Sequence, residues 1–201
     1  MKRLSYDSII TYLFFILLII TFIWDEIYRG GEKSPRILLT FITLLALKLF
    51  CKFTFLKRSK IIYTAIVIFI FFSMYLANVL NFYSIANYDK MLHLSSGLLI
   101  GIIGFAVYVY LFNPNKNKDI KKFAMVLFTT MFSVACAGIW EIWEFTTDNL
   151  FNLTAQNGLN DTMLDIICGT IGGIVITIPI YLYSKGMKSK ILDNIIKEIA
   201  D

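Results

Sequence analysis

The 201-residue sequence has few charged residues, a single histidine and only three cysteines. Charged side chains make up 16% of the chain, against about a quarter in ordinary soluble domains, which leaves no room for a sizeable soluble domain. Cys51, Cys136 and Cys168 form no CxxC pair, so they indicate neither a zinc ribbon nor a redox motif. The sequence also has no serine nucleophile elbow, zincin helix or P-loop, which excludes the best-known hydrolase and nucleotide-binding signatures.

Most of the chain is apolar, with 58% hydrophobic residues and a mean hydropathy of +0.71. The apolar residues form runs of roughly twenty, the length at which an α-helix crosses about 30 Å of hydrocarbon. We therefore predict an all-α, polytopic membrane protein with six transmembrane helices, whose first partner is the lipid bilayer. The predicted spans are 8–24, 37–56, 61–82, 90–112, 122–145 and 160–184.

The net charge of +5 arises from basic residues in short loops beside the apolar runs, which argues against a nucleic-acid partner. Alternate loops differ in basic residues, and the positive-inside rule then places both termini in the cytoplasm. The Ile, Lys, Asn and Phe content is typical of AT-rich bacterial coding sequence, so we expect a bacterial inner (plasma) membrane. The basic residues on the predicted cytoplasmic side are Lys2, Arg3, Lys52, Lys57, Arg58, Lys60, Lys116, Lys118, Lys121, Lys122, Lys185, Lys188, Lys190 and Lys197.

The two halves of the chain differ in polarity. Residues 1–82 supply three helices of nearly pure Leu, Ile and Phe, which we interpret as scaffold. Residues 83–184 supply the last three helices, a core with an outward-facing cluster of acids and histidine. Residues 185–201 place apolar side chains at helical spacing and predict a cytoplasmic amphipathic tail, either on the inner leaflet or as a plain cytosolic helix.

The fourth and sixth helices begin with a similar pattern. Asp89 and His93 are four residues apart at the start of the fourth helix, so they share one face. Asp161 and Asp165 have the same spacing at the start of the sixth helix. Glycines continue both faces into the membrane, a pattern that lets helices approach closely in lipid. They are Gly97, Gly101 and Gly104 on the fourth helix and Gly169, Gly172 and Gly173 on the sixth.

The fifth helix ends with a third group of acids. At 100° per residue, Glu141, Glu144 and Asp148 fall within about 60° of arc. Trp140 and Trp143 point elsewhere, which suits lipid headgroups. The acids are therefore expected to face the neighbouring helices.

The last three helices thus bring carboxylates and one imidazole together near the outer leaflet. So many carboxylates cannot stay ionised side by side without a counter-charge. Either a divalent metal ion lies among them with His93 as a nitrogen ligand, or some of the acids keep their protons. The predicted metal ligands are His93, Glu141, Glu144, Asp161 and Asp165, and the predicted ligand-binding residues are Asp89, Lys90, Asp148 and Gln156.

Plain structural roles stay open for several of these residues. Asp89 and Asp161 stand where an N-cap is expected, and Asp148 suits a solvated loop. His93 could be a hydrogen-bonded interface residue, and Lys90 a pairing or snorkelling lysine. Glu141, Glu144 and Asp165 are the hardest to explain in this way, because they lie one to two turns inside the predicted spans.

The same residues carry a resemblance to a known family. The motifs Asp89-Lys90-x-x-His93, Glu141-x-x-Glu144 and Thr154-x-Gln156-x-Gly158-x-x-Asp161-Thr162-x-x-Asp165 resemble the YjdF-like bacterial inner-membrane proteins, over about 88–175. More distantly they resemble VanZ, a teicoplanin-resistance protein, in which Gln and Asn are expected at the positions of Glu144 and Asp165. The YjdF-like resemblance implies a membrane location and marks the same residues, but it supplies no reaction.

Three functional hypotheses follow. The first is an envelope membrane protein that binds a divalent cation or a cationic, lipid-linked or cell-wall-linked ligand in an outer-leaflet acidic pocket. If it is an enzyme, which the residues leave open, it performs metal-assisted chemistry on an envelope lipid, with Glu141 and Glu144 as candidate catalytic residues. The second is a small proton- or cation-coupled transporter, and the third is a non-catalytic interaction subunit. The residues leave the oligomeric state open.

Overall fold

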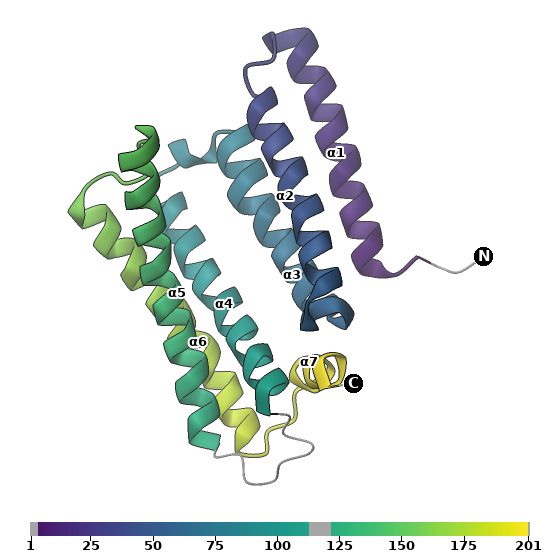
Figure 1. Cartoon of the computed structure of the whole chain (residues 1–201), viewed down its shortest axis with the longest axis vertical. Helices are drawn as coiled ribbons and strands as arrows, with labels where there is room; N and C mark the ends of the chain where they lie inside the picture. The colour runs from purple at the N-terminus through teal and green to yellow at the C-terminus, as the bar shows by residue number, and fades with distance from the viewer. Residues whose placement is uncertain (1–3, 113–121, 201) are drawn as a thin grey trace. The chain divides into compact units, whose positions relative to one another are not determined.

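The computed structural model describes residues 4–112 and 122–200, and the regular elements in that part of the chain are all helices. The chain divides into two compact units, Met1–Tyr88 and Asp89–Asp201. The α-helices are α1 (Tyr6–Arg29), α2 (Ser34–Phe53), α3 (Lys60–Ile70), α4 (Tyr88–Phe112), α5 (Lys122–Phe151), α6 (Leu159–Ser184) and α7 (Lys190–Ala200), as labelled in Figure 1. The other helical elements are η1 (Phe55–Arg58), η2 (Phe71–Val79) and η3 (Phe82–Ser84).

Among the described residues, five helical segments are long and apolar enough to cross a membrane. Much of their apolar surface is exposed: only 17% of the most apolar part of α1 is buried, and 39% of that of α4. Soluble proteins rarely expose apolar faces of this length, whereas hydrocarbon solvates them. The five segments are Tyr6–Arg29, Lys60–Val79, Tyr88–Phe112, Phe123–Phe151 and Leu159–Ser184.

These segments confirm the all-α, multi-span class and overlap five of the six predicted spans. The remaining prediction, 37–56, overlaps the 20-residue helix α2 (Ser34–Phe53), which is not among the five. This helix carries Arg36, Lys48 and Lys52. Six spans, and the orientation that depends on an even number of them, therefore stay predictions.

The first unit is held together by an apolar core between α1, α2, α3 and η2. Phe14 of α1 makes edge-to-face contacts with Phe71 and Tyr75, at ring-centroid distances of 5.4 and 6.0 Å. Two hydroxyl pairs add polar contacts across the unit: Thr11 with the Tyr63 hydroxyl at 3.0 Å, and Thr21 with the Tyr75 hydroxyl at 2.8 Å. The buried core residues are Phe14, Leu18, Ile37, Leu44, Val67, Ile70, Tyr75 and Val79.

The third predicted span is not a uniform α-helix. From Phe71 to Val79 the backbone forms a π-helix, and the Leu80 amide donates to the Tyr75 carbonyl five residues earlier. The Tyr88 hydroxyl donates to the Phe72 carbonyl at 2.9 Å, which gives a carbonyl in this stretch a further partner. The sequence of 61–82 gave no sign of this change, because the segment is apolar along its length and would suit an α-helix or a π-helix equally.

The second unit contains α4, α5 and α6, which lie side by side in Figure 1. The predicted close approach of the glycine faces is present. A methyl group added at Gly97 would overlap the Gly169 backbone oxygen, and one added at Gly172 would overlap the Leu94 carbonyl. The Ser133 hydroxyl of α5 donates to the Gly97 carbonyl at 3.0 Å. Glycine therefore brings the backbones of α4 and α6 into direct contact. This contact fixes the positions of the polar side chains at the starts of the two helices.

The end of α5 extends beyond the predicted span. The helix continues to Phe151, so only 152–158 separates it from α6. Thr146 and Asn149 donate to the carbonyls four residues earlier, both at 2.7 Å, and occupy carbonyls of the last turns. Asn152 then takes a left-handed conformation, with φ of 53°, which ends the helix.

The predicted amphipathic tail forms the helix α7. Leu192, Ile195 and Ile199 are buried, and the Tyr183 hydroxyl donates to Asp193 at 2.6 Å. Whether this helix lies on the inner leaflet stays a prediction. Several basic residues used to predict the orientation lie outside the described residues, namely Lys2, Arg3, Lys116, Lys118 and Lys121.

Candidate functional site

The first turns of α4 carry three polar side chains of the candidate site. Asp89 and His93 are one turn apart and project from the same face, as predicted. The His93 side chain is 12% exposed and that of Asp89 is 35% exposed. The histidine therefore lies below the acid, where water is scarce and polar partners matter more.

Lys90 is surrounded by carboxylates. Its ammonium Nζ lies 3.1 Å from Asp89 Oδ2, 2.5 Å from Asp161 Oδ1 and 2.7 Å from Asp165 Oδ1. An ammonium has three donor hydrogens, so these three aspartates use its full capacity. Lys90 thus supplies the counter-charge of these three aspartates, and its ion pairs join α4 to α6.

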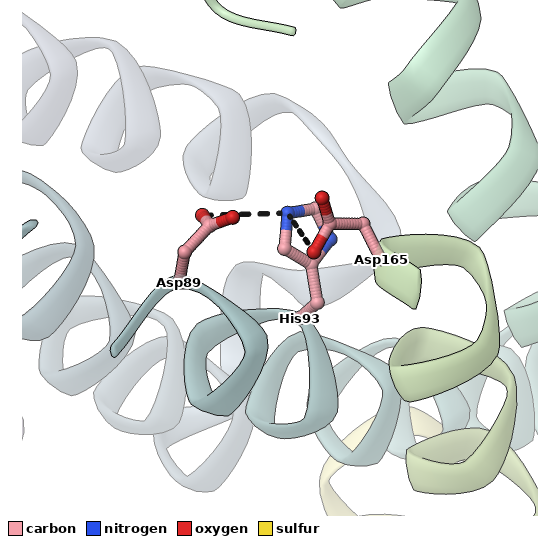
Figure 2. A group of neighbouring side chains, drawn as sticks. All are labelled: Asp89, His93 and Asp165. Atoms are coloured by element: carbon pink, nitrogen blue, oxygen red, sulfur yellow. Dashed lines mark ion pairs between the residues drawn. The ribbon is translucent and has the colours of Figure 1, made fainter. Parts of the chain in front are cut away.

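The His93 imidazole lies between carboxylates on both of its edges. On one edge, Nε2 lies 3.7 Å from Asp89 Oδ1 and 3.6 Å from Asp165 Oδ1, as Figure 2 shows. On the other edge, Nδ1 lies 4.0 Å from Glu141 Oε1. One imidazole nitrogen of His93 and one oxygen from each aspartate all lie within 4.8 Å of one another, a group that could hold a metal ion.

Glu141 is the most deeply placed acid of α5, with 4% of the residue exposed. Its Oε1 atom is buried and, among the described residues, has no hydrogen-bond partner. His93 Nδ1 lies 4.0 Å from this oxygen. A buried carboxylate oxygen without a hydrogen bond is costly, so a closer contact with a donor such as His93 Nδ1 would stabilise it.

Asp165 holds the opposite wall of the site. It is 2% exposed and lies one turn above Gly169, at the level where α6 approaches α5 and α4. A Cβ at Gly169 would meet the Ala137 Cβ at 2.9 Å and the His93 carbonyl at 3.7 Å. The missing side chain at this position therefore allows Asp165 to reach His93.

The segment after α5 folds back over the acids. Both carboxylate oxygens of Asp148 accept backbone hydrogen bonds, from the Ala155 amide at 2.9 Å and the Gln156 amide at 3.0 Å. The Gln156 side-chain amide then donates to the Glu141 carbonyl at 3.2 Å and is 3.5 Å from Glu141 Oε2. Asp148 therefore positions the loop, and Gln156 fixes the other oxygen of Glu141.

Glu144 occupies a different place from the other predicted ligands. Its Oε1 accepts a hydrogen bond from Trp140 Nε1 at 2.8 Å. It is not part of the three-residue group around His93 Nε2. Trp140 and Trp143 are both exposed, as expected for side chains at a lipid interface.

The structure thus separates the predicted site residues into two sets. Six of them form one connected group around Lys90 and His93, whereas Glu144, Asp148 and Gln156 make the contacts described above. The six are Asp89, Lys90, His93, Glu141, Asp161 and Asp165.

One buried acid outside this region was missed. Asp25, near the end of α1, is 1% exposed, and its Oδ2 accepts from the Lys33 amide at 2.8 Å and the Ser34 hydroxyl at 3.3 Å. It caps the start of α2 and so stabilises the α1–α2 hairpin. The available signal was an acid directly after the first apolar run, followed by Gly30 and Gly31.

Comparison with known proteins places this chain in a family. The model of the family described as "Predicted membrane protein (DUF2238)" matches residues 10–186, which include the whole acidic cluster. The protein belongs to the DUF2238 family. Membership is consistent with the YjdF-like resemblance, whereas the resemblance to VanZ stays a prediction.

Another match is an uncharacterized protein of Thermotoga maritima, which is 33% identical over 118 residues. The match covers 58% of this chain and 58% of that protein. No solved structure matches the chain. The family description, a predicted membrane protein, agrees with the long apolar helices, and the chemistry of the site has to be argued from its residues.

Proposed function

We propose that this DUF2238 protein binds a divalent metal ion between α4 and α6, with Asp89, His93 and Asp165 as ligands. The observation that carries the proposal is the placement of His93 between two acidic walls. Its Nε2 edge faces two aspartate oxygens, and its Nδ1 edge faces the unpartnered, buried Oε1 of Glu141.

The spacing around Nε2 suits a metal ion. Two ligands of a tetrahedral ion, each about 2.1 Å from it, lie about 3.4 Å apart. The distances from Nε2 to the two aspartate oxygens are 3.7 and 3.6 Å. Small side-chain rotations therefore bring the three atoms onto one ion. An imidazole with two carboxylates suits Zn²⁺ or Mn²⁺ better than an ion that prefers oxygen alone.

Glu141 has the place of an orienting carboxylate. A histidine that binds metal through one ring nitrogen usually donates its other N–H to a carboxylate, which fixes the ring and its tautomer. His93 Nδ1 and Glu141 Oε1 are the correct partners for this contact and lie 4.0 Å apart. A modest movement of the ring would bring them to hydrogen-bonding distance. In this proposal Glu141 acts through His93, and Glu144 and Asp161 are not ligands.

The site is proposed to open to the outer leaflet. Six spans, with α2 as the second, place both termini in the cytoplasm by the positive-inside rule. The starts of α4 and α6 and the end of α5 then lie on the outer side. The bound ion is accessible there to phosphorylated or otherwise anionic headgroups of envelope lipids.

A catalytic role for the ion is the second candidate function. A bound divalent ion can polarise a phosphoryl oxygen or activate water. Glu141 would then act as general base in place of its orienting role, because its Oε1 has no hydrogen-bond partner among the described residues, whereas Glu144 accepts from Trp140. A transport role receives less support, because residues 94–112 of α4 contain no Asp, Glu, Lys or Arg to continue a path inward.

The direct test is the metal content of protein purified in detergent after loading with Zn²⁺ or Mn²⁺. Wild type should carry about one ion per chain, and Asp165→Asn, which keeps the side-chain shape, should lose it. Asp193→Asn is the matched control, since Asp193 of α7 accepts a hydrogen bond from Tyr183 of α6 and lies outside the site. Absence of stoichiometric metal from the wild type, or equal loss in the two variants, would overturn the proposal.

A further inference from the structure

A cavity with several charged side chains on its wall lies within the first unit, where α1 begins, α2 ends and α3 begins. Its volume is about 490 Å³, large enough for a small headgroup. The charged side chains that line it are Lys48, Lys52, Lys57, Lys60 and Asp7. The proposed metal site lies in the other unit and does not bear on this cavity.

The four lysines, all exposed, make the cavity positively charged. Among the described residues, none of them has a carboxylate within the 4.0 Å that defines an ion pair. Lys48 lies over the ring of Tyr12, another lining residue, at 5.7 Å, which holds it near the cavity wall. Four ammonium groups and one carboxylate give the lining a net positive charge, which favours binding of an anion.

The remaining wall is apolar on one side and hydroxylated on the other. Leu45, Leu49 and Leu56 provide the apolar side, and the linked hydroxyls of Thr11 and Tyr63 provide the other, with an oxygen separation of 3.0 Å. A cavity with this division suits an amphiphile better than a free inorganic ion. Its position beside apolar helix faces gives acyl chains a path into the bilayer.

Asp7 limits which anion fits. Its Oδ1 atom is buried and has no hydrogen-bond partner among the described residues. A carboxylate in a basic cavity repels a negatively charged phosphate oxygen placed beside it. It accepts a hydrogen bond from a hydroxyl at the same place. The headgroup should therefore carry a phosphodiester and, beside it, hydroxyl donors.

We propose that this cavity binds the headgroup of an anionic phospholipid of the phosphatidylglycerol type. The phosphodiester lies among the four lysines, a headgroup hydroxyl donates to Asp7, and the acyl chains follow Leu45 and Leu49. Under the proposed orientation the cavity faces the cytoplasmic leaflet. Basic pockets between transmembrane helices on that side hold anionic headgroups in other membrane proteins.

Native mass spectrometry of the full chain in detergent tests the proposal, with phosphatidylglycerol and phosphatidylcholine of the same chain length as probes. Wild type should retain phosphatidylglycerol at least 10-fold more tightly. Lys48→Gln/Lys60→Gln should remove that preference, and the single variant Lys60→Gln should weaken it about 3-fold or more. Lys188→Gln is the matched control, because Lys188 is exposed and does not line the cavity.

Three results would overturn this inference. Equal retention of the two lipids by wild type would exclude a headgroup site. An equal loss in the Lys188→Gln control would show general attraction to basic residues. Full displacement of the lipid by inorganic phosphate at the same concentration would show that the ligand is a soluble anion instead of a lipid.

Discussion

Lys90 Nζ lies 2.7 Å from Asp165 Oδ1, the oxygen that also lies 3.6 Å from His93 Nε2. The ammonium and a bound metal ion would therefore share one carboxylate oxygen. Each cation supplies the counter-charge that buried acids need, so each weakens binding of the other. Lys90 is thus a built-in competitor of the proposed ion.

Replacing Lys90 by Met should therefore make the protein depend on metal. Loss of one partner of a buried ion pair costs about 3–5 kcal/mol, because the remaining charges are uncompensated. Metal-free Lys90→Met should melt at a lower temperature than wild type, and Zn²⁺ or Mn²⁺ should raise its melting temperature by more than that of wild type. A thermal shift titration measures both effects. A variant with lower stability and no larger metal response would contradict competition.

Glu141 and Glu144 should differ sharply although they are three residues apart. Partners that orient a metal-bound histidine typically contribute about 10- to 100-fold to metal affinity. Glu141→Gln should therefore weaken binding by about that factor. Glu144→Gln keeps an oxygen that can accept from Trp140 and should leave the affinity nearly unchanged. Competition with a metal-sensitive dye measures both, and equal losses would show that the pair acts jointly as ligands.

The glycine contact beneath the site predicts a stability difference between two substitutions. In Gly97→Ala the new methyl would overlap the Gly169 backbone, so we expect a loss of about 1–3 kcal/mol from overpacking. Gly138→Ala meets nothing within 4 Å and should be neutral or stabilise α5 by up to about 1 kcal/mol. Unfolding of both variants in the same detergent measures the difference. Equal melting temperatures would show that α4 and α6 are farther apart than described.

The loop above the site should loosen when Asp148 is removed. Asp148→Ala deletes the acceptor of the Ala155 and Gln156 amides, so cleavage by a broad-specificity protease within 152–158 should rise several-fold. Asn149→Ala is the control, since the Asn149 side chain donates to the Phe145 carbonyl of its own helix. Mass mapping of the first cleavage site measures the effect. Equal cleavage of the two variants would mean that Asp148 does not hold the loop.

Local sequence patterns predicted much of this fold. The length and apolarity of the runs located the helices, and the four-residue spacing of Asp89 and His93 placed both on one face. The glycines on α4 and α6 correctly indicated close backbone contact, because small residues have few other uses at that spacing. These features are set by helical periodicity, which can be read directly from a sequence.

Other features depend on tertiary contacts and could not be predicted. The direction of Glu144 is set by a hydrogen bond to Trp140, and helical angles alone placed it with Glu141. The three-aspartate environment of Lys90 requires the register of α4 against α6, which the glycine contact fixes. The π-helix at Phe71 and the continuation of α5 to Phe151 arise from hydrogen bonds that an apolar pattern does not encode.

Pulsed electron paramagnetic resonance of Cu²⁺-loaded protein, purified without a polyhistidine tag, tests the central claim most directly. The chain contains one histidine, so any imidazole nitrogen coupling to the bound ion comes from His93. We predict a single-imidazole signal at about one Cu²⁺ per chain in the wild type and its loss in His93→Gln. Stoichiometric binding without an imidazole signal, or no binding at all, would contradict a metal site at Asp89, His93 and Asp165.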